Sequence, residues 1–160
     1  MRLLKHLLTP HWWALRVFSS GTLRQIQSAI KASERQHDGE LRFAVEAGLP
    51  FDFLRTTTRK RAEALFGQLG VWDTEHNSGV LVYVQLVDRR IEIVADRGIS
   101  AKVEPTEWRS ICRRMEESFR KRDFLNGSLE AIEAITRHLA HHFPPRGRNP
   151  NELPDKPVVL

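Results

Sequence analysis

The sequence contains a single cysteine, Cys112, among its 160 residues. One thiol excludes an internal disulfide framework and any zinc site built from several cysteines, and this composition is typical of a reducing compartment. Cysteine phosphatase chemistry also needs an arginine six positions after the cysteine, and that position holds Ser118. We therefore interpret Cys112 as a core residue on an apolar helical stripe.

Long apolar runs are lacking as well. No segment approaches the roughly 18–20 apolar residues that span a bilayer, and Lys5, Pro10 and Arg16 interrupt an N-terminus that would otherwise look like a signal peptide. The sequence has no glycine-rich phosphate loop, no zincin histidine pair on a helix and no nucleophile elbow. We therefore expect a soluble, cytoplasmic protein outside these enzyme classes.

Basic residues outnumber acidic ones, which gives a net charge of +5 and a pI near 9.9. Such a balance suits an anionic partner, although net charge alone causes only non-specific attraction. The basic residues cluster at 59–61, at 89–90 and between 109 and 122. Glutamates interleave the last cluster, and the aromatic residues of its helix fall on the apolar stripe. These patterns are typical of solvated helix faces, so nucleic acid is not the expected partner.

Residues 1–18 combine leucines and two tryptophans with basic side chains. Tryptophans and cations together suit a membrane interface, whereas a short amphipathic segment more often buries its apolar face against its own domain. We expect residues 1–21 to pack on the domain, with Trp12 and Trp13 buried. Peripheral contact with an anionic membrane through residues 1–18 is the alternative.

Hydrophobic periodicity divides residues 22–143 into helices and strands. Strand patterns occur at 40–47, which alternates as a half-buried strand does, at 80–87, which is almost continuously apolar, and at 90–95, which follows a turn. Because a helix joins the first two strands, they should be parallel with a right-handed connection. We predict an α/β fold, a three-layer sandwich with a mixed β-sheet and helices on both faces.

The ends of these elements carry local signals. Thr22 with Gln25 forms a capping box for the first long helix, and Gly70 suits a left-handed cap after the second. The segment RDFLNGS separates the last two helices. From Pro144 onward, five of the eight prolines occur without apolar periodicity, so we expect 144–160 to be an extended tail.

Polar residues gather just before the apolar strand, in VWDTEHNSGVLVY. Carboxylates at the end of a strand can bind Mg²⁺ or Ca²⁺ through their oxygens. Asp73 and Glu75 supply part of such a set. Asp96, just past the third strand, joins them if the sheet brings the two loops together.

The segment RAEALFGQLGVWDTEHNSGVLVYVQLVDRRIEIVADRGI, followed by FRKRDFLNGSLEAI, resembles the TPM domain family over about residues 22–143. This family is a widespread α/β domain of membrane-associated proteins, and the chain resembles its compact form, without the usual signal peptide and transmembrane helix. The resemblance implies a mixed sheet sandwiched by helices. It also implies an acidic pocket, which binds divalent cations in some members, and a phosphatase activity, which is assigned to a few.

The implied pocket is matched only in part. In the family loop before the second strand, Asp73 and Gly79 match, while Asn77 stands where a second aspartate often occurs. In the segment between the last helices, Asp123 matches, and Leu125 occupies the position of another aspartate. Each replacement removes a charged oxygen ligand, so affinity for a hard cation should fall.

After the third strand, where the family has a glycine, an aromatic residue and a glycine, this chain has Asp96, Arg97 and Gly98. Asp96 adds a carboxylate, and we expect Arg97 to pair with the carboxylates in the place of the cation. The resemblance thus implies a site that binds Ca²⁺ or Mg²⁺ weakly. Its expected ligands are Asp73, Asp96 and Asp123, and its expected lining residues are Glu75, Asn77, Gly79, Arg97 and Gly98.

Two functional hypotheses follow. No nucleophile, general base and anion cradle can be assembled at recognisable spacing, which favours a non-enzymatic binding or assembly-supporting module with a degenerate acidic pocket and an unidentified protein partner. The alternative is a weak metal-dependent acid phosphatase that acts on phosphomonoesters, and it rests on the family resemblance.

Overall fold

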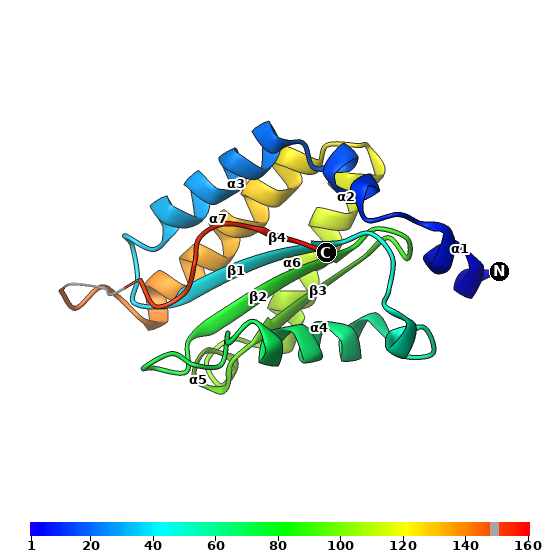
Figure 1. Ribbon diagram of the computed structural model, residues 1–160. Helices are drawn as coiled ribbons and strands as arrows, with labels where there is room; N and C mark the ends of the chain where they lie inside the picture. The colour runs from blue at the N-terminus through cyan, green and yellow to red at the C-terminus, as the bar shows by residue number, and fades with distance from the viewer. Residues whose placement is uncertain (148–150) are drawn as a thin grey trace.

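The computed structural model describes residues 1–147 and 151–160, and its centre is a four-stranded β-sheet (Figure 1). β1 pairs in parallel with β2 and β4, whereas β2 and β3 are antiparallel. The mixed sheet predicted from the sequence is therefore confirmed. The strands, in the spatial order β3-β2-β1-β4, are β1 (Glu40–Glu46), β2 (Gly79–Gln85), β3 (Arg90–Ala95) and β4 (Val158–Val159).

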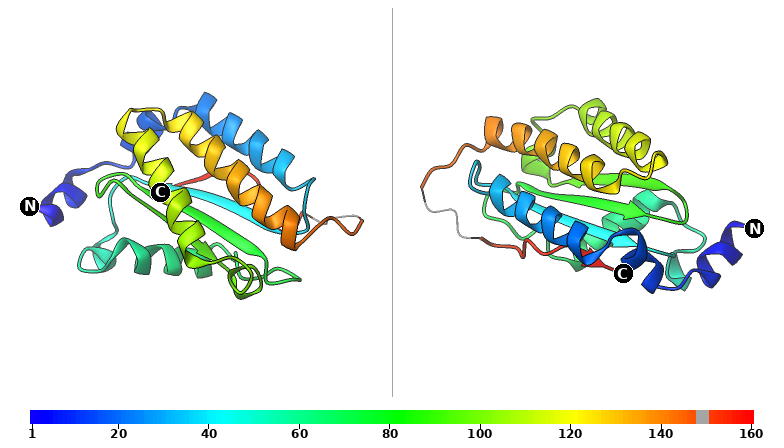
Figure 2. Two further views of the ribbon diagram at one scale, coloured as in Figure 1. Left: turned by 180° about the vertical axis from the view of Figure 1, so that it is seen from behind. Right: turned by 90° about the horizontal axis from the view of Figure 1, so that it is seen from above.

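Helices cover both faces of the sheet, which confirms the predicted three-layer sandwich (Figure 2). Three long helices pack over the larger core on one face: α3 (Ser20–Ser33), α6 (Pro105–Arg120) and α7 (Phe124–His142). The other face carries α4 (Thr58–Gln68) over a smaller core. The short elements are α1 (Arg2–Leu8), α2 (Trp12–Val17), the 3₁₀ helix η1 (Phe51–Phe53) and α5 (Arg97–Ser100). In the part of the chain that the structure describes, no helix combines the length and apolar character that crossing a bilayer requires.

Two helices begin earlier than predicted. The side chain of Ser19 accepts a hydrogen bond from the Thr22 N–H at 3.2 Å, so α3 begins at Ser20 and Thr22 is not its cap. The side chain of Asp123 accepts from the Asn126 N–H at 3.2 Å, so α7 begins inside the expected break. Both caps satisfy an N–H that has no partner within its helix.

β1 is buried along its whole length, so the prediction of a half-buried strand is wrong. Its polar side chains face α4 and the C-terminal segment, where they have buried partners. Glu46 pairs with Arg61 at 2.5 Å, and Arg42 donates to the carbonyl oxygens of Pro154 and Lys156. The alternation in the sequence therefore reflects two different covered faces and not one solvated face.

The proline-rich C-terminal residues are extended, and they add a strand that no pattern in the sequence indicated. The Leu160 N–H donates to the carbonyl oxygen of Val45 at 2.8 Å, and the Ala47 N–H donates to that of Leu160 at 3.1 Å. Leu153 is buried in the smaller core. A two-residue strand is too short to show periodicity. Residues 148–150 of the expected tail lie outside the described residues.

The N-terminal helices contact the domain through few side chains. His6, Ala14 and Phe18 are buried, whereas Trp12 is 58% exposed and Trp13 is only half-buried. The expectation that both tryptophans would be buried is therefore wrong. In the preceding helix α1, polar side chains and not apolar ones face the domain.

Candidate functional site

The loop before β2 and the loop after β3 lie against each other. The Asp96 N–H donates to the Gly79 carbonyl oxygen at 2.8 Å. Gly98 comes so close that a Cβ at this position would lie 2.4 Å from the carbonyl oxygen of His76 and 2.5 Å from that of Asn77. The contact therefore requires glycine at 98, and the two predicted acidic loops do share one end of the sheet.

The side chains of these loops do not close around a common point. Asp73 and Glu75 are exposed, and Asp96 Oδ1 accepts the Arg97 N–H at 2.7 Å as the cap of α5. The guanidinium of Arg97 is exposed and pairs with none of these three carboxylates, so it does not take the place of a cation. Among the described residues, no three His, Cys, Asp or Glu side chains are grouped as a metal site requires.

Asp123 lies at the opposite end of the sheet from Asp73 and Asp96. Its carboxylate caps α7 and also accepts from the side-chain amide of Asn126 at 3.1 Å. Its sequence neighbours on both sides line a cleft beside the last residues of β2, whereas Asp96 contacts the first. The structure therefore does not bring the three expected ligands together. Asn77 and Leu125 are separated in the same way, so they do not mark one degenerate site.

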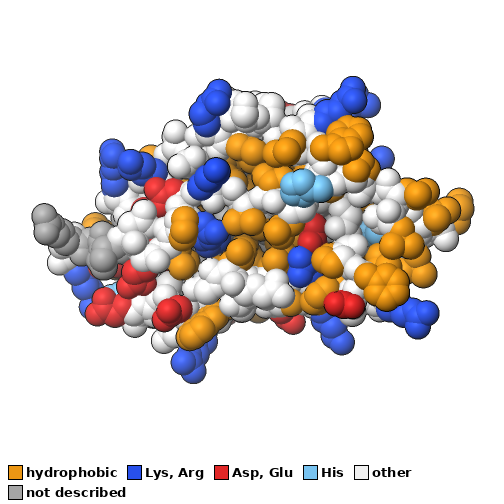
Figure 3. Space-filling view, in the orientation of Figure 1, with side chains coloured by type: hydrophobic (Ala, Val, Ile, Leu, Met, Phe, Trp, Pro, Cys, Tyr) orange, Lys and Arg blue, Asp and Glu red, His pale blue; other side chains and the backbone are white. Residues whose placement is uncertain are grey.

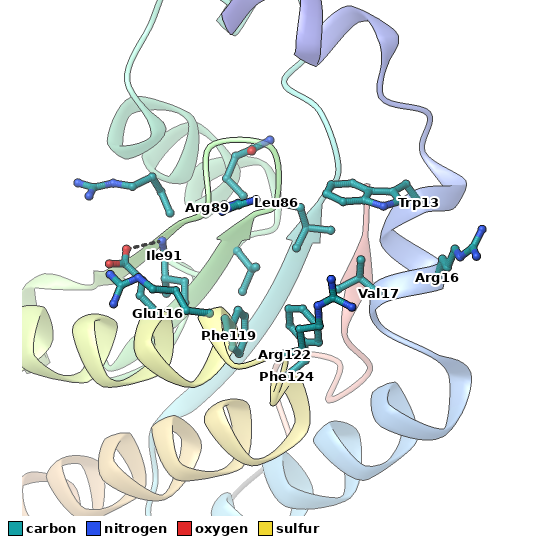
Figure 4. A pocket seen from close by; sticks show the side chains of 14 residues that line it. Trp13, Arg16, Val17, Leu86, Arg89, Ile91, Glu116, Phe119, Arg122 and Phe124 are labelled. Carbon is teal, nitrogen blue, oxygen red and sulfur yellow. Dashed lines mark hydrogen bonds between the residues drawn. The ribbon is translucent and has the colours of Figure 1, made fainter.

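The cleft at this second end has a volume of about 750 Å³ (Figure 4). It opens between α2, the turn that joins β2 to β3, and the junction of α6 with α7. This is the end of the sheet beyond the carboxyl terminus of β2, where α/β proteins commonly bind ligands. Its apolar floor is formed by Val17, Val84, Leu86, Ile91, Phe119 and Phe124.

Five exposed arginines surround this floor, and we call the site the arginine cleft: Arg16, Arg89, Arg90, Arg120 and Arg122. None of their guanidinium groups lies within 4.0 Å of a carboxylate of the described residues. Glu116 is the one acidic lining residue, and its Oε1 accepts the Ile91 N–H at 3.2 Å. Figure 4 shows Arg122 beside Val17 and Phe124, and Arg16 turned outward. The cleft therefore combines an apolar floor with a strongly cationic rim.

The backbone at two of these arginines is in the left-handed region. Arg89 has φ 53° and Arg122 has φ 63°, and only one other described non-glycine residue, Asn77, has a positive φ. Arg122 follows α6 at the position where a Schellman motif normally has glycine: its N–H donates to the Phe119 carbonyl oxygen, and the next N–H donates to that of Ser118. Such strain costs about 1 kcal/mol or more per residue and often occurs at functional sites.

The arginine cleft was missed because its residues are distant in the sequence. Arg89 and Arg90 lie on the hairpin turn, Arg120 and Arg122 lie about thirty positions later, and Arg16 comes from α2. Each cluster alone is typical of a solvated surface. One local signal was available, since long cationic side chains occupy a tight hairpin turn and a helix C-terminus, where glycine or asparagine is usual.

A buried polar network lies beneath α4. Arg61 donates to the Glu46 carboxylate through Nε at 3.0 Å and Nη2 at 2.5 Å, and the Tyr83 hydroxyl donates to it at 2.5 Å. Burial, and then the charge of Glu46, raises the pKa of Tyr83, so its hydroxyl remains a donor. The Phe53 ring covers the guanidinium with its centroid 4.8 Å away. Both oxygens of the Glu46 carboxylate accept hydrogen bonds from these buried side chains, so we interpret the network as structural.

A second titratable group holds the C-terminal segment. The Glu40 carboxylate accepts the N–H groups of Glu152 at 3.0 Å and Leu153 at 3.3 Å. Burial raises the pKa of Glu40 to about 7. Burial, a hydrogen bond with Asp155 and the charge of Glu40 together raise the pKa of Glu34 to about 9. Both carboxyl groups interact with other parts of the same chain. We therefore assign them a role in stability and not in ligand binding.

The fold is an α/β sandwich in which a parallel β1–α4–β2 unit is extended by an antiparallel hairpin, with a cationic cleft beyond β2. The chain belongs to the TPM domain family, whose model matches residues 15–138. The resemblance drawn from the sequence is thus confirmed. No curated protein shows significant similarity to the chain.

Solved structures share this fold. The BA42 protein of the psychrophilic bacterium Bizionia argentinensis is 26% identical, with a TM-score of 0.77 over 88% of this chain and 93% of that protein. The N-terminal domain of a P. gingivalis protein is 21% identical, with a TM-score of 0.60 over 92% and 100% of the two chains. The N-terminal domain of the cg2496 protein from Corynebacterium glutamicum is 14% identical, with a TM-score of 0.52 over 76% and 73%. The last two likenesses concern the fold alone.

Proposed function

We propose that this TPM-domain protein is a non-enzymatic binding module that takes an anionic group of its partner in the arginine cleft. The observation that carries the proposal is the set of five guanidinium groups, free of carboxylates of the described residues, around an apolar floor. Guanidinium groups bind carboxylate and phosphate oxygens through paired hydrogen bonds. A concave cationic surface also concentrates anions near it. The apolar floor suits the uncharged part of such a ligand.

The residues that line the arginine cleft are suited to binding a ligand and not to catalysing a reaction on it. Hydrolysis of a phosphomonoester needs a nucleophile or activated water and a base within reach of it. The lining contains no cysteine, serine, threonine or histidine. Its one carboxylate, on Glu116, already accepts a backbone N–H. The cleft can therefore hold an anion, and it lacks the groups that would transform one.

A weak, metal-dependent phosphatase at the other end of the sheet is the second candidate. One observation favours it: Asp96 Oδ2 is buried and has no hydrogen-bond partner among the described residues. A Ca²⁺ or Mg²⁺ ion bound at Asp96 would satisfy this oxygen. With at most two carboxylates, such a site would bind the cation weakly, in keeping with a degenerate acidic pocket.

Titration calorimetry with inorganic pyrophosphate tests the first proposal. The variant R90A/R120A removes two cleft arginines, and R109A/R113A removes the same charge from exposed positions of α6 outside the cleft. We expect pyrophosphate binding that weakens with salt, falls at least tenfold in R90A/R120A, and changes little in R109A/R113A. Equal losses of pyrophosphate binding in both variants would show that binding depends on net charge alone and not on the cleft. Turnover of a phosphomonoester that requires Mg²⁺ and is abolished by Asp73→Ala would instead favour the phosphatase.

A further inference from the structure

Exposed apolar side chains are concentrated at one end of the molecule. Of the nine large apolar side chains that are exposed among the described residues, eight belong to α1, α2 and η1 or their ends: Met1, Leu3, Leu4, Leu7, Leu8, Trp12, Leu15 and Phe51. We call these the apolar end, and Figure 3 shows apolar side chains gathered there over α1. The ninth, Trp72, lies in the loop before β2, at the other end of the sheet. A contiguous exposed apolar patch commonly marks an interaction surface.

The apolar end is exposed because α1 is attached through its polar side chains. Arg2 donates to both oxygens of Asp88, at 2.9 and 2.7 Å. His6 is buried, with Nε2 3.1 Å from Asp88 Oδ1 and Nδ1 3.0 Å from the Leu49 amide nitrogen. The η1 segment is tied to the same helix, because Arg2 Nη1 donates to the Leu54 carbonyl oxygen at 3.0 Å. The leucines of α1 consequently face solvent, the reverse of the usual amphipathic arrangement.

Most charges around the apolar end are positive, and the exceptions are Asp52 beside Phe51 and Asp88, which pairs with Arg2. Residues 1–33 contain no aspartate or glutamate. Asp88, which holds α1, is followed directly by Arg89 and Arg90 of the arginine cleft. The helix α2 joins the two surfaces, since Trp13 and Arg16 line the cleft while Trp12 and Leu15 are exposed. The helix α2 thus contributes side chains to both, and the apolar end and the arginine cleft are adjacent parts of the molecular surface.

We infer that this surface docks on an anionic lipid bilayer. Leucine side chains and Trp12 would enter the boundary between headgroups and acyl chains, and the cleft arginines would contact lipid phosphates. The second of these contacts rests on the proposed function of the cleft, and the first does not. A symmetric dimer through the same surface would bring together two copies of a cationic surface that includes Lys5, Arg16, Arg89 and Arg90. A bilayer with anionic headgroups offers the complementary charge.

Vesicle sedimentation with the full chain tests the inference. We expect binding to phosphatidylcholine vesicles that contain phosphatidylglycerol, and at least tenfold weaker binding to vesicles of phosphatidylcholine alone. Trp12→Asp and Leu8→Asp should each reduce binding at least tenfold. Trp72→Asp is the matched control, because Trp72 is 56% exposed and Trp12 is 58% exposed, and it should bind as the wild type does. Circular dichroism and thermal denaturation establish that each variant is folded.

Several outcomes would overturn the inference: no binding to the anionic vesicles, equal binding to both vesicle types, or an equal loss in Trp72→Asp and Trp12→Asp. A dimer in analytical ultracentrifugation that Leu8→Asp disperses, without vesicle binding, would assign the apolar end to a second copy. Pyrophosphate titration of the same variants distinguishes a failure of the membrane inference from a failure of the proposed function. Trp12→Asp and Leu8→Asp should retain pyrophosphate binding, whereas R90A/R120A should lose it.

Discussion

His6 in α1 and Asp88 in the turn between β2 and β3 are joined by a hydrogen bond of 3.1 Å. The direction of this bond is determined by the other ring nitrogen. Because the Leu49 N–H donates to Nδ1, the ring proton is on Nε2, which donates to Asp88. The carboxylate thus holds α1 in place and pairs with Arg2 as well.

Asp88→Ala should therefore loosen α1. It leaves the buried ring N–H of His6 without its acceptor, which costs about 1–3 kcal/mol of unfolding free energy. Urea denaturation measures this loss, and limited trypsin digestion at Lys5 should become faster. Asp73→Ala is the control, because Asp73 is exposed and away from α1, and it should change stability by less than about 0.5 kcal/mol. Equal protection of Lys5 in both variants would contradict the anchoring role.

Arg61→Met should be among the most destabilising substitutions at a polar residue. It leaves the Glu46 carboxylate buried with only Tyr83 as a partner, and breaking such a pair costs about 3–5 kcal/mol. The double variant E46L/R61M removes both charges, so it should be more stable than Arg61→Met alone. The unfolding free energies of the wild type, E46L, R61M and E46L/R61M, measured by chemical denaturation, form a double-mutant cycle. Additive losses would show that the two side chains are not coupled.

Glu34 should make stability depend on pH. Its pKa is raised to about 9 in the folded protein, mainly by burial, from an ordinary value of 4.5. The folded state therefore retains a proton that the unfolded chain loses. The stabilisation is complete below pH 4.5 and is lost as pH rises through about 9, by up to roughly 1.4 kcal/mol per pH unit.

The variant E34Q lacks this titration, so its unfolding free energy relative to the wild type should increase steadily from pH 5 to pH 9. Comparing the two proteins at each pH cancels the titrating groups that do not interact with Glu34, unlike Glu40 and Asp155, which do. Another titrating group is His37, whose pKa burial lowers to about 4 and which therefore destabilises the fold as pH falls. A constant difference in unfolding free energy across this range would show that Glu34 does not cause the pH dependence.

Arg122→Gly and Arg122→Ala should separate the charge of the cleft from its backbone strain. Both remove the guanidinium, so both should weaken pyrophosphate binding to the same extent. Only glycine relieves the left-handed conformation at φ 63°, so it should be more stable than the alanine variant by about 1 kcal/mol. Calorimetry and thermal denaturation give the two quantities. Equal stabilities would indicate that the conformation is not strained.

The helices and strands of this protein follow from local patterns, and its sites do not. The apolar stripe with Trp108, Ile111 and Met115 identifies α6, because these residues recur at helical spacing and share the core. The loops at Gly79 and Gly98 meet because their strands are neighbours, which a predicted hairpin already implies. Local sequence patterns predict the structure correctly wherever the relevant contacts connect adjacent elements.

The rest depends on contacts between segments that are distant in the sequence. Asp123 is matched to the family by its motif, yet the length of α6 carries it to the far end of the sheet. Arg16 and Arg120 line the same cleft only because of tertiary packing. The exposure of the leucines of α1 follows from the contacts of His6, whose partner Asp88 lies in another element. No window of sequence contains both members of such pairs.

The sheet has a further consequence for the order in which it assembles. Its register pairs Gln85 with Arg90, Glu40 with Gly79, and Ala44 with Val158, so sequence separation grows from one edge to the other. The entropy lost on closing each intervening loop grows in the same direction. The hairpin of β2 and β3 therefore has the smallest barrier to formation, and β4 adds last. In native-state hydrogen exchange, the amide of Leu160 should open well before those of β2, through local detachment of the edge and not through global unfolding.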